Sequence, residues 1–215
     1  MALLLLRAVL AAFIGYLLGS ANTSLIVGRF YGVDVRKHGS GNAGMTNTLR
    51  TMGKLPALLV IIGDILKGVL SCVIGYYILK DAGSIVSFSG VGDIDNMGLL
   101  AGGIGAIVGH NWPLYFGFKG GKGILTTFAV VMMSDPLIGL ILLGIFIIIV
   151  AITRYVSLGS IIAAALFPVA AGVLSGDMIF VGFAGVIGLL AILRHHSNIG
   201  RLLKGTESKL GVKKA

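Results

Sequence analysis

The chain has 215 residues and a formal net charge of +9, and 56% of its residues are hydrophobic while only 12% are charged. Its mean hydropathy of +1.01 argues against a soluble enzyme and indicates an integral membrane protein. The single cysteine, Cys72, excludes a disulfide framework and a cysteine-ligated metal site. The basic residues lie beside apolar segments without interleaved aromatic residues, so they indicate membrane topology and anionic ligands rather than nucleic acid.

Seven apolar segments follow one another, and an α-helix needs about 20 residues to cross a bilayer. The first lacks a basic stretch before it and continues as apolar sequence to Val27, which favours a retained span over a signal peptide. The fourth is too short to cross alone, so either residues 120–127 extend it or it is re-entrant. Ser134-Asp135-Pro136 then predicts a tight turn. The segments are 3–28, 55–79, 97–117, 124–133, 136–153, 158–174 and 177–194.

The basic residues are distributed unevenly between the two sides of such a bundle. With seven crossings, 14 of the 17 lysines and arginines fall on one side, in or beside the loops 31–54, 118–123, 154–157 and 195–215. The positive-inside rule makes that side cytoplasmic, with the N-terminus outside and the C-terminus in the cytoplasm. We therefore expect an all-α integral membrane protein: one polytopic domain over residues 1–215, a bundle of seven transmembrane helices with one short or re-entrant span. The opposite side carries Asp81, Asp93, Asp95, Asp135 and Asp177.

The segment Gly39–Arg50, GSGNAGMTNTLR, gathers glycine, hydroxyl and amide residues between two apolar segments. Its GxGxxG pattern formally matches a dinucleotide-binding loop, but that loop follows a strand, whereas a spanning helix precedes this one. Glycine amides with the side chains of Ser40 and Arg50 suit a phosphate, because N–H donors and a guanidinium complement its oxygens. The alternative is a polar re-entrant loop that stabilises helix ends. In the phosphate-binding interpretation Ser40 and Arg50 are the main contacts, with a role for Asn42 and Asn47 in holding the shape of the loop.

A second glycine-rich segment, FKGGKG at residues 118–123, follows the sequence GHNWPLYFG. It is not a P-loop, because Phe116 replaces the first glycine of that motif and Gly123 stands where Ser or Thr is required. A GGKG turn that opens onto a helix nevertheless offers amides, a lysine and a positive helix end to an anion. The alternative is an ordinary juxtamembrane basic loop, with Trp112 and Tyr115 in an interfacial aromatic belt.

Two further polar groups lie in or beside the apolar segments. Asp64 and Lys67 are three residues apart in the second segment, so they share a helix face. We expect a structural ion pair inside the bundle, with proton or substrate handling as the alternative. Ser157 or Ser160, at the start of the sixth segment, is expected either to cap that helix or to contact a ligand.

The C-terminal tail contains RHHSNIGRLLKGTESK, which begins at Arg194. His195 and Asn198 would face together if the last helix continues; histidine exchanges a proton near neutral pH and asparagine can donate to an oxyanion. No carboxylate or cysteine stands beside the paired histidines, so a zinc site is not expected. A basic tail that binds anionic headgroups explains Lys213 and Lys214, but it does not explain Asn198 or Glu207.

Taken together and in this order, three segments resemble the motifs of the bacterial acyl-phosphate-dependent glycerol-3-phosphate acyltransferases (PlsY type). They are GSGNAGMTNTLR, GHNWPLYFGFKGGKG and RHHSNIGRLLKGTESK. The segments Asp64–Gly68 and Ser157–Leu158 are also similar to the family, and the resemblance extends from the first span to the tail. Leu125 departs from it, because a small residue is expected after GKG.

The resemblance implies transfer of a fatty acyl group from acyl phosphate to the 1-hydroxyl of sn-glycerol 3-phosphate, which gives lysophosphatidic acid and phosphate. It implies no cofactor and no metal, a site on the cytoplasmic side of a bacterial inner membrane, surrounding membrane lipids, and an upstream enzyme that forms acyl phosphate. The expected catalytic residues are His195, Asn198, Ser40 and Arg50. The residues expected to bind the substrates or their phosphates are Ser40, Gly41, Asn42, Arg50, Lys119, Gly120, Gly121, Lys122, Gly123, Ser157, Asn198, Arg201 and Glu207.

Direct transfer is expected, because acyl phosphate is already activated and needs positioning and charge stabilisation rather than an acyl-enzyme. The proton acceptor is either His195 or a phosphate oxygen of the substrate. The alternative function is a small transporter or channel for an organic phosphate, which requires a polar route to both faces, whereas the outer loops are acidic and poor in motifs. A non-catalytic lipid-binding subunit would not need three glycine-polar motifs.

Overall fold

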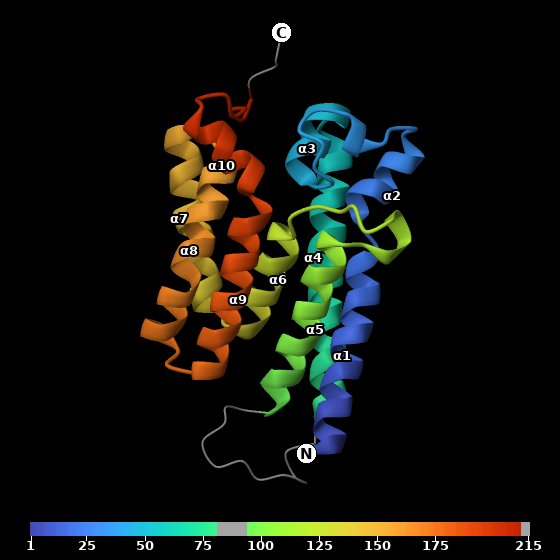
Figure 1. Ribbon diagram of the computed structural model, residues 1–215, viewed down its shortest axis with the longest axis vertical. Helices are drawn as coiled ribbons and strands as arrows, with labels where there is room; N and C mark the ends of the chain where they lie inside the picture. The colour runs from blue at the N-terminus through green and yellow to red at the C-terminus, as the bar shows by residue number, and fades with distance from the viewer. Residues whose placement is uncertain (81–93, 212–215) are drawn as a thin grey trace. The chain divides into compact units, whose positions relative to one another are not determined.

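The computed structural model describes residues 1–80 and 94–211, and every regular element in these residues is helical. The chain divides into two compact units, Met1–Ser134 and Asp135–Ala215. Both are drawn in Figure 1. Unit 1 contains α1 (Ala2–Ser20), α2 (Thr23–Phe30), η1 (Val35–Lys37), α3 (Met45–Met52), α4 (Lys54–Leu79), α5 (Ile94–Asn111), η3 (Leu114–Phe116) and α6 (Ile124–Ser134). Unit 2 contains α7 (Pro136–Thr153), α8 (Val156–Leu174), α9 (Met178–Arg194) and α10 (His196–Leu203).

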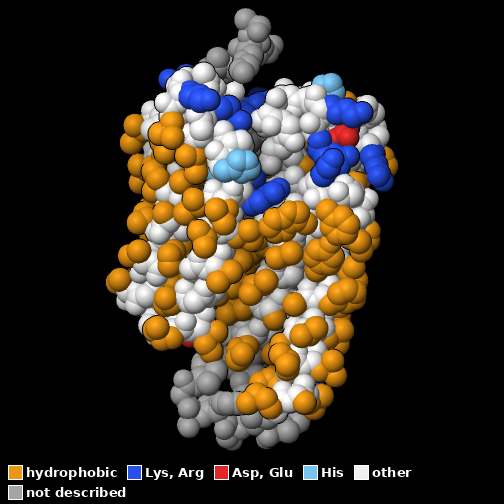
Figure 2. All heavy atoms as spheres, viewed as in Figure 1, with side chains coloured by type: hydrophobic (Ala, Val, Ile, Leu, Met, Phe, Trp, Pro, Cys, Tyr) orange, Lys and Arg blue, Asp and Glu red, His pale blue; other side chains and the backbone are white. Residues whose placement is uncertain are grey.

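The helices have the length and composition of membrane spans. Among the described residues, four stretches are long and apolar enough to cross a bilayer, and a fifth is added if α9 and α10 form one span. Hydrophobic side chains cover the visible flanks of the helices, and basic side chains gather over the α2–α3 end of unit 1 (Figure 2). The seven crossings and their orientation stay predictions; Asp81, Asp93, Lys213 and Lys214, used in that argument, lie outside the described residues. The four stretches that are long and apolar enough to cross a bilayer are Ala2–Phe30, Lys54–Leu79, Pro136–Thr153 and Val156–Leu174.

In unit 1, α5 packs against both α1 and α4 through backbone contacts at glycines (Figure 1). A Cβ added at Gly102 would overlap the carbonyl oxygen of Ser71 in α4, and one added at Gly15 in α1 would overlap the carbonyl oxygen of Gly102. Small residues let helix backbones approach closely, which replaces the hydrophobic driving force that is absent between helices in lipid. The glycine content therefore fixes α5 between its neighbours.

In unit 2, α8 packs against α7 and α9. Phe167 of α8 lies edge-on to Phe180 and Phe183 of α9, with ring centroids 5.7 and 6.0 Å away. Asp135 precedes α7 and its carboxylate accepts a hydrogen bond from the backbone N–H of Ile138 at 3.0 Å. The turn expected at Ser134-Asp135-Pro136 is therefore the junction between α6 and α7.

The last apolar segment, 177–194, ends where α9 ends, at Arg194, and α10 begins at His196 after a bend of 57°. The condition under which His195 and Asn198 would face together, a last helix that continues, is therefore not met. The imidazole Nδ1 of His195 lies 2.7 Å from the carbonyl oxygen of Ala191, the atom that the His195 N–H would use in a continuous α-helix. That N–H donates to Ile192 instead.

Three boundaries differ from the sequence-based expectation. Residues 120–123 are not helical, so they do not extend α6, whose 11 residues rise only about 16 Å. The segment 97–117 is α-helical only to Asn111, because Pro113 follows and lacks the N–H that a helix needs. The polar segment 39–50 is a loop only to Gly44; from Met45 it is the amphipathic helix α3.

The glycine contacts of α5 predict a difference between two glycine-to-alanine substitutions. Gly102→Ala should lower the free energy of unfolding by about 1–3 kcal/mol, because the new methyl group overlaps the backbone of α4. Gly144→Ala in α7 meets no atom within 4 Å and should be neutral or stabilising by up to about 1 kcal/mol. Thermal unfolding in one detergent compares them, and equal midpoints would contradict this packing.

Candidate functional site

The break between α1 and α2 is the first element of the site in unit 1. α1 ends at Ser20, and Asn22 caps α2 by accepting a hydrogen bond from the N–H of Leu25 at 3.2 Å. The amide Nδ2 of Asn22 also donates to the carbonyl oxygen of Ala43 at 3.4 Å, so one side chain joins the break to the loop 39–44. Both Asn22 and Ala43 are fully buried.

Asp64 and Lys67 of α4 bond the residues on both sides of this break. Their carboxylate Oδ1 and ammonium Nζ atoms are 2.9 Å apart, and both side chains are buried. Lys67 also donates to the last carbonyls of α1, at 3.1 Å to Gly19, while Thr23 at the start of α2 donates to Asp64 at 3.0 Å. The ion pair therefore supplies partners to backbone and side-chain groups that a helix break leaves unsatisfied inside a bilayer.

His110, near the end of α5, connects the ion pair to the second glycine loop. Its Nδ1 lies 3.0 Å from Lys67 Nζ. Its carbonyl oxygen accepts a hydrogen bond from the N–H of Gly121 at 3.1 Å. A Cβ at Gly121 would overlap both the His110 Nε2 atom and the carbonyl oxygen of Ala43. The loops 39–44 and 120–123, far apart in the sequence, therefore meet at Ala43 and Gly121.

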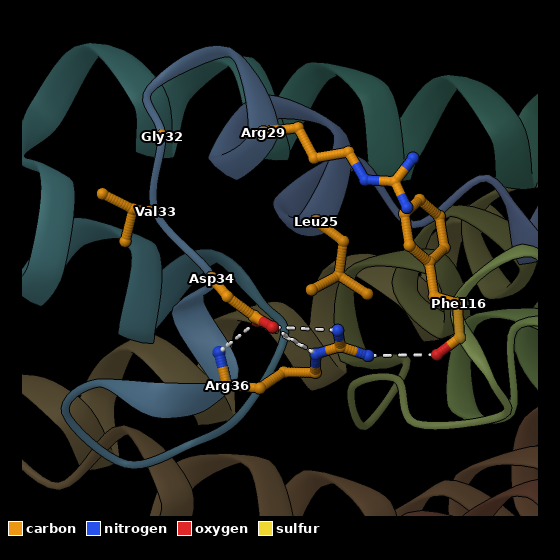
Figure 3. Close-up of a pocket in the computed structure, with 7 residues that line it drawn as sticks. All are labelled: Leu25, Arg29, Gly32, Val33, Asp34, Arg36 and Phe116. Atoms are coloured by element: carbon orange, nitrogen blue, oxygen red, sulfur yellow. Dashed lines mark hydrogen bonds and ion pairs between the residues drawn. The ribbon is translucent and has the colours of Figure 1, made fainter.

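Arg36, which precedes the first loop, bonds the backbone just before the second loop and lines a pocket of about 290 Å³. Asp34 holds the guanidinium through two contacts of 2.9 Å, and Arg36 Nη1 donates to the carbonyl oxygen of Phe116 at 3.0 Å (Figure 3). A longer contact of 3.4 Å reaches the carbonyl of Lys119. The Arg36 hydrogen bonds lower the pKa of the Asp34 carboxyl despite opposition from burial, which keeps the pair ionised near neutral pH.

Asn47 of α3 holds the backbone of the loop 38–40. Its Nδ2 donates to the carbonyls of Val35 and His38 at 2.8 and 3.0 Å, and its Oδ1 accepts from the N–H of Ser40 at 2.8 Å. The side chain is 1% exposed. The shape-holding role considered for Asn47 therefore has a direct structural basis, and its effect is to fix the residues next to Ser40.

The expected phosphate-binding residues of unit 1 lie at one end of the unit, around these fastened loops (Figure 1). Ser40 and Gly41 are exposed in the first loop, and Arg50 is exposed in the last turn of α3. Gly123 has φ +74°, a conformation that favours glycine and that turns the second loop into α6. Within the described residues, no three His, Cys, Asp or Glu side chains gather to hold a metal ion. In the second loop Lys119 is exposed, Gly120 and Lys122 are half-buried, and Gly121 is buried; Asn42 of the first loop is half-buried.

In unit 2, the carboxylate of Glu207 brings together the other predicted residues. It accepts hydrogen bonds from Asn198 Nδ2 at 2.7 Å, Ser157 Oγ at 2.8 Å and Arg201 Nε at 2.6 Å. The tail continues to the α7–α8 junction, where the N–H of Leu210 donates to the carbonyl of Arg154 at 2.7 Å. Glu207 thus orders Asn198 and Ser157, which come from different helices.

The expectation that Ser157 or Ser160 caps α8 is wrong. Tyr155 is the residue at the cap, and its side chain makes no capping hydrogen bond. The hydroxyl of Ser157 donates to Glu207, and the hydroxyl of Ser160 donates back to the carbonyl of Val156 at 3.0 Å. Ser157 is already inside α8, one residue after its start, and its hydroxyl bonds a carboxylate, which is a stronger acceptor than a neutral group.

Sequence reasoning missed three residues of unit 1 that fasten the loops. The sequence indicates Arg36 only as one of the basic residues, His110 only as a member of a motif, and Asn22 only as part of an apolar segment. A signal for Asn22 was present, because Asn22-Thr23-Ser24 is a polar run within the segment 3–28, and Asn is a strong helix N-cap residue. The partners of His110 are distant in the sequence, so no local pattern indicates them.

The fold and the site define a class: a helical integral membrane protein whose glycine-rich loops and basic residues suit a phosphate. The family model for glycerol-3-phosphate acyltransferase matches residues 9–205. The chain belongs to this family.

Individual relatives agree with the family match. Relatives named glycerol-3-phosphate acyltransferase are 42% identical in Thermoanaerobacter sp. (strain X514), over 96% of this chain and 97% of the relative, and 43% identical in Halalkalibacterium halodurans, over 93% of each. A solved integral membrane glycerol 3-phosphate acyltransferase, PlsY in its glycerol 3-phosphate form, superposes with a TM-score of 0.82 at 36% identity and covers 95% of this chain and 96% of that one.

The contacts of Asn47 predict that an acidic substitution loosens the first loop. Asn47→Asp keeps an acceptor for Ser40 but turns a negative charge toward the carbonyls of Val35 and His38. Amide hydrogen exchange of residues 38–44 should become at least about tenfold faster, because the two lost hydrogen bonds leave buried carbonyls unpaired. Thr51→Val, whose hydroxyl bonds only carbonyls within α3, is the control. Unchanged exchange in Asn47→Asp would remove this role.

The environment of Glu207 predicts a pH-dependent stability of unit 2. Burial raises the pKa of its carboxyl, but hydrogen bonds from Arg201, Asn198 and Ser157 outweigh burial and hold the pKa below its ordinary value. Because the folded-state pKa is depressed, the stabilisation is complete above the ordinary pKa of about 4.3 and is lost as the pH falls through the folded-state pKa.

The difference in thermal midpoint between the parent protein and Glu207→Gln should therefore be largest near pH 7. It should shrink below about pH 4, where the parent carboxylate becomes protonated as well. A difference that stays constant from pH 7 to the acid limit of the folded protein would show that the charge of Glu207 contributes nothing.

Proposed function

We propose that this protein transfers a fatty acyl group from acyl phosphate directly to the 1-hydroxyl of sn-glycerol 3-phosphate. The hydroxyl oxygen attacks the acyl carbonyl carbon, an ester bond forms, and the bond between that carbon and the phosphate oxygen breaks. The hydroxyl proton passes to a base, and the products are lysophosphatidic acid and inorganic phosphate. Phosphate is a good leaving group, so no acyl-enzyme is required.

The observation that carries this proposal is the meeting of the two glycine-rich loops at Ala43 and Gly121 in unit 1. Both substrates bear a phosphate, and this end of the unit offers backbone amides together with the side chains of Ser40, Arg50 and Lys122. A guanidinium and an ammonium complement phosphate oxygens by charge-assisted hydrogen bonds. The solved relatives support the acceptor and the product, since they are described as glycerol 3-phosphate and lysophosphatidic acid forms of PlsY.

His195 and Asn198 of unit 2 are assigned to the transfer itself. His195 Nδ1 lies 2.7 Å from the carbonyl of Ala191, an acceptor, so a neutral ring carries its hydrogen on Nδ1 and its lone pair on Nε2. That tautomer is the one able to take a proton at Nε2, and a phosphate oxygen of the substrate is the competing base. Asn198 is oriented by Glu207 and is assigned to stabilising charge on the carbonyl oxygen.

The same proposal includes the setting of the enzyme. We assign seven crossings to one membrane domain, with the N-terminus outside and the motif loops and C-terminus in the cytoplasm, because 14 of the 17 basic residues then lie on the cytoplasmic side. In the bacterial inner membrane the acyl chain stays in hydrocarbon while both phosphates face water. An enzyme that forms acyl phosphate must act upstream.

The donor and the residue roles are tested with purified protein in nanodiscs. Acyl phosphate and labelled sn-glycerol 3-phosphate should give lysophosphatidic acid, and acyl-CoA should give none. Arg50→Ala should lose activity by about 100-fold or more, because it removes a charged phosphate contact, whereas Lys80→Ala at the other end of α4 should retain it.

His195→Ala should slow turnover by about 10²–10⁴-fold if the imidazole is the base. Near-normal turnover of this variant would assign the proton to the substrate phosphate instead. Absence of acylated product beside a working control enzyme, together with uptake of labelled glycerol 3-phosphate into sealed proteoliposomes, would support a transporter instead of the enzyme.

A further inference from the structure

We propose that His110 is a positioning residue of the phosphate site: a neutral imidazole that Lys67 holds with its hydrogen on Nε2, facing the contact between Ala43 and Gly121. The inference rests on the proposed function for its kinetic consequence, but not for its structural part. Neither the motif reading nor the family resemblance assigns this residue a role, and it follows from the donors and acceptors buried around α4 and α5.

The donors of Lys67 decide the state of His110. An ammonium group has three N–H donors and no acceptor. The three nearest acceptors of Nζ are Asp64 Oδ1 at 2.9 Å, His110 Nδ1 at 3.0 Å and the carbonyl oxygen of Gly19 at 3.1 Å, and the carbonyl oxygen of Ala21 is more distant at 3.5 Å. Lys67 donates along its three shortest contacts only if His110 Nδ1 accepts, which requires that Nδ1 carry no hydrogen.

The charges of the cluster give the same result. Asp64 and Lys67 compensate each other, and both are buried together with His110. The other side chains that bond the cluster, Thr23 from α2 and Thr126 from α6, are uncharged. An imidazolium would lie 3.0 Å from Lys67 Nζ and 3.6 Å from Asp64 Oδ1, so two buried positive charges would share one carboxylate, which is costly. The neutral ring with hydrogen on Nε2 is the form that satisfies both requirements.

The Nε2 side of the His110 imidazole, opposite Lys67, lies next to the two glycine-rich loops. A Cβ added at Gly121 would overlap both His110 Nε2 and the carbonyl oxygen of Ala43, so both atoms lie next to the α-carbon of Gly121. His110 Nε2 therefore borders the contact between Ala43 and Gly121, while the His110 carbonyl accepts a hydrogen bond from the N–H of Gly121 in the second loop. One residue thus sets the distance between the loops, and Lys67 sets the rotation of its ring.

The tautomer is measured without any activity assay. Histidine-selective ¹⁵N labelling of the full-length protein in nanodiscs, with His110→Gln to assign the resonances, should show His110 Nδ1 as an unprotonated nitrogen and Nε2 as a protonated one at pH 7. In the double variant Asp64→Asn/Lys67→Met, which removes both charges, the preference for this tautomer should be lost. The opposite tautomer, or an imidazolium, in the parent protein would overturn the proposal.

The kinetic consequence is tested with two isosteres. His110→Gln keeps an N–H at the position of Nε2, whereas His110→Asn reaches only the position of Nδ1. We expect KM for sn-glycerol 3-phosphate to rise by about tenfold or more in His110→Asn and by less than about threefold in His110→Gln, with kcat little changed in both. Thr126→Val, which removes a buried hydrogen bond to the backbone of Asp64 and leaves the contact between Lys67 and His110 in place, is the control for lost stability.

Thermal midpoints of the three variants separate a role in stability from a role in positioning. Equal KM values for His110→Asn and His110→Gln, or a rise in KM that follows the midpoint in Thr126→Val as well, would overturn the positioning role. If the parent protein lacks acyl transfer altogether, the proposed function fails, and the ¹⁵N measurement still decides the state of His110.

Discussion

The buried ion pair of Asp64 and Lys67 is the interaction on which the rest of unit 1 depends. An apolar segment that breaks inside a membrane protein leaves carbonyls at one helix end and donors at the next, and lipid satisfies neither. Lys67 bonds the last carbonyls of α1, and Asp64 accepts from Thr23 at the start of α2. Removal of one charge would leave the other buried without its counterion, which typically costs about 3–5 kcal/mol.

The consequences of the break extend to the chemistry. Because α2 starts afresh at Asn22, that side chain can reach Ala43, and the loop 39–44 is fastened to the membrane-spanning part of unit 1. Because His110 is held by Lys67, the second loop has a fixed support at Gly121. Catalysis of acyl transfer from an activated donor depends mainly on positioning and charge stabilisation. A rigid support under two glycine-rich loops is what such a reaction requires.

The sequence predicts local features well and long-range partners poorly, for physical reasons that particular residues show. The spacing of Asp64 and Lys67 indicates one helix face, because only helix geometry is needed. The α9–α10 bend is an exception among local features, because the contact between His195 Nδ1 and the carbonyl of Ala191 spans only four residues and no residue pattern indicates it. Ser157 and Glu207 are 50 residues apart, and their hydrogen bond exists only because the tail returns to the start of α8. The family resemblance indicates the candidate site residues, and the structure shows which side chains hold them in place.

We propose that the loops 39–44 and 120–123 form one phosphate site, which hydrogen exchange can test. The purified protein in nanodiscs is titrated with sn-glycerol 3-phosphate in the absence of an acyl donor. Amides of both loops should gain protection with the same midpoint concentration. Protection of one loop alone, or of neither loop in a preparation that turns over substrate, would contradict it.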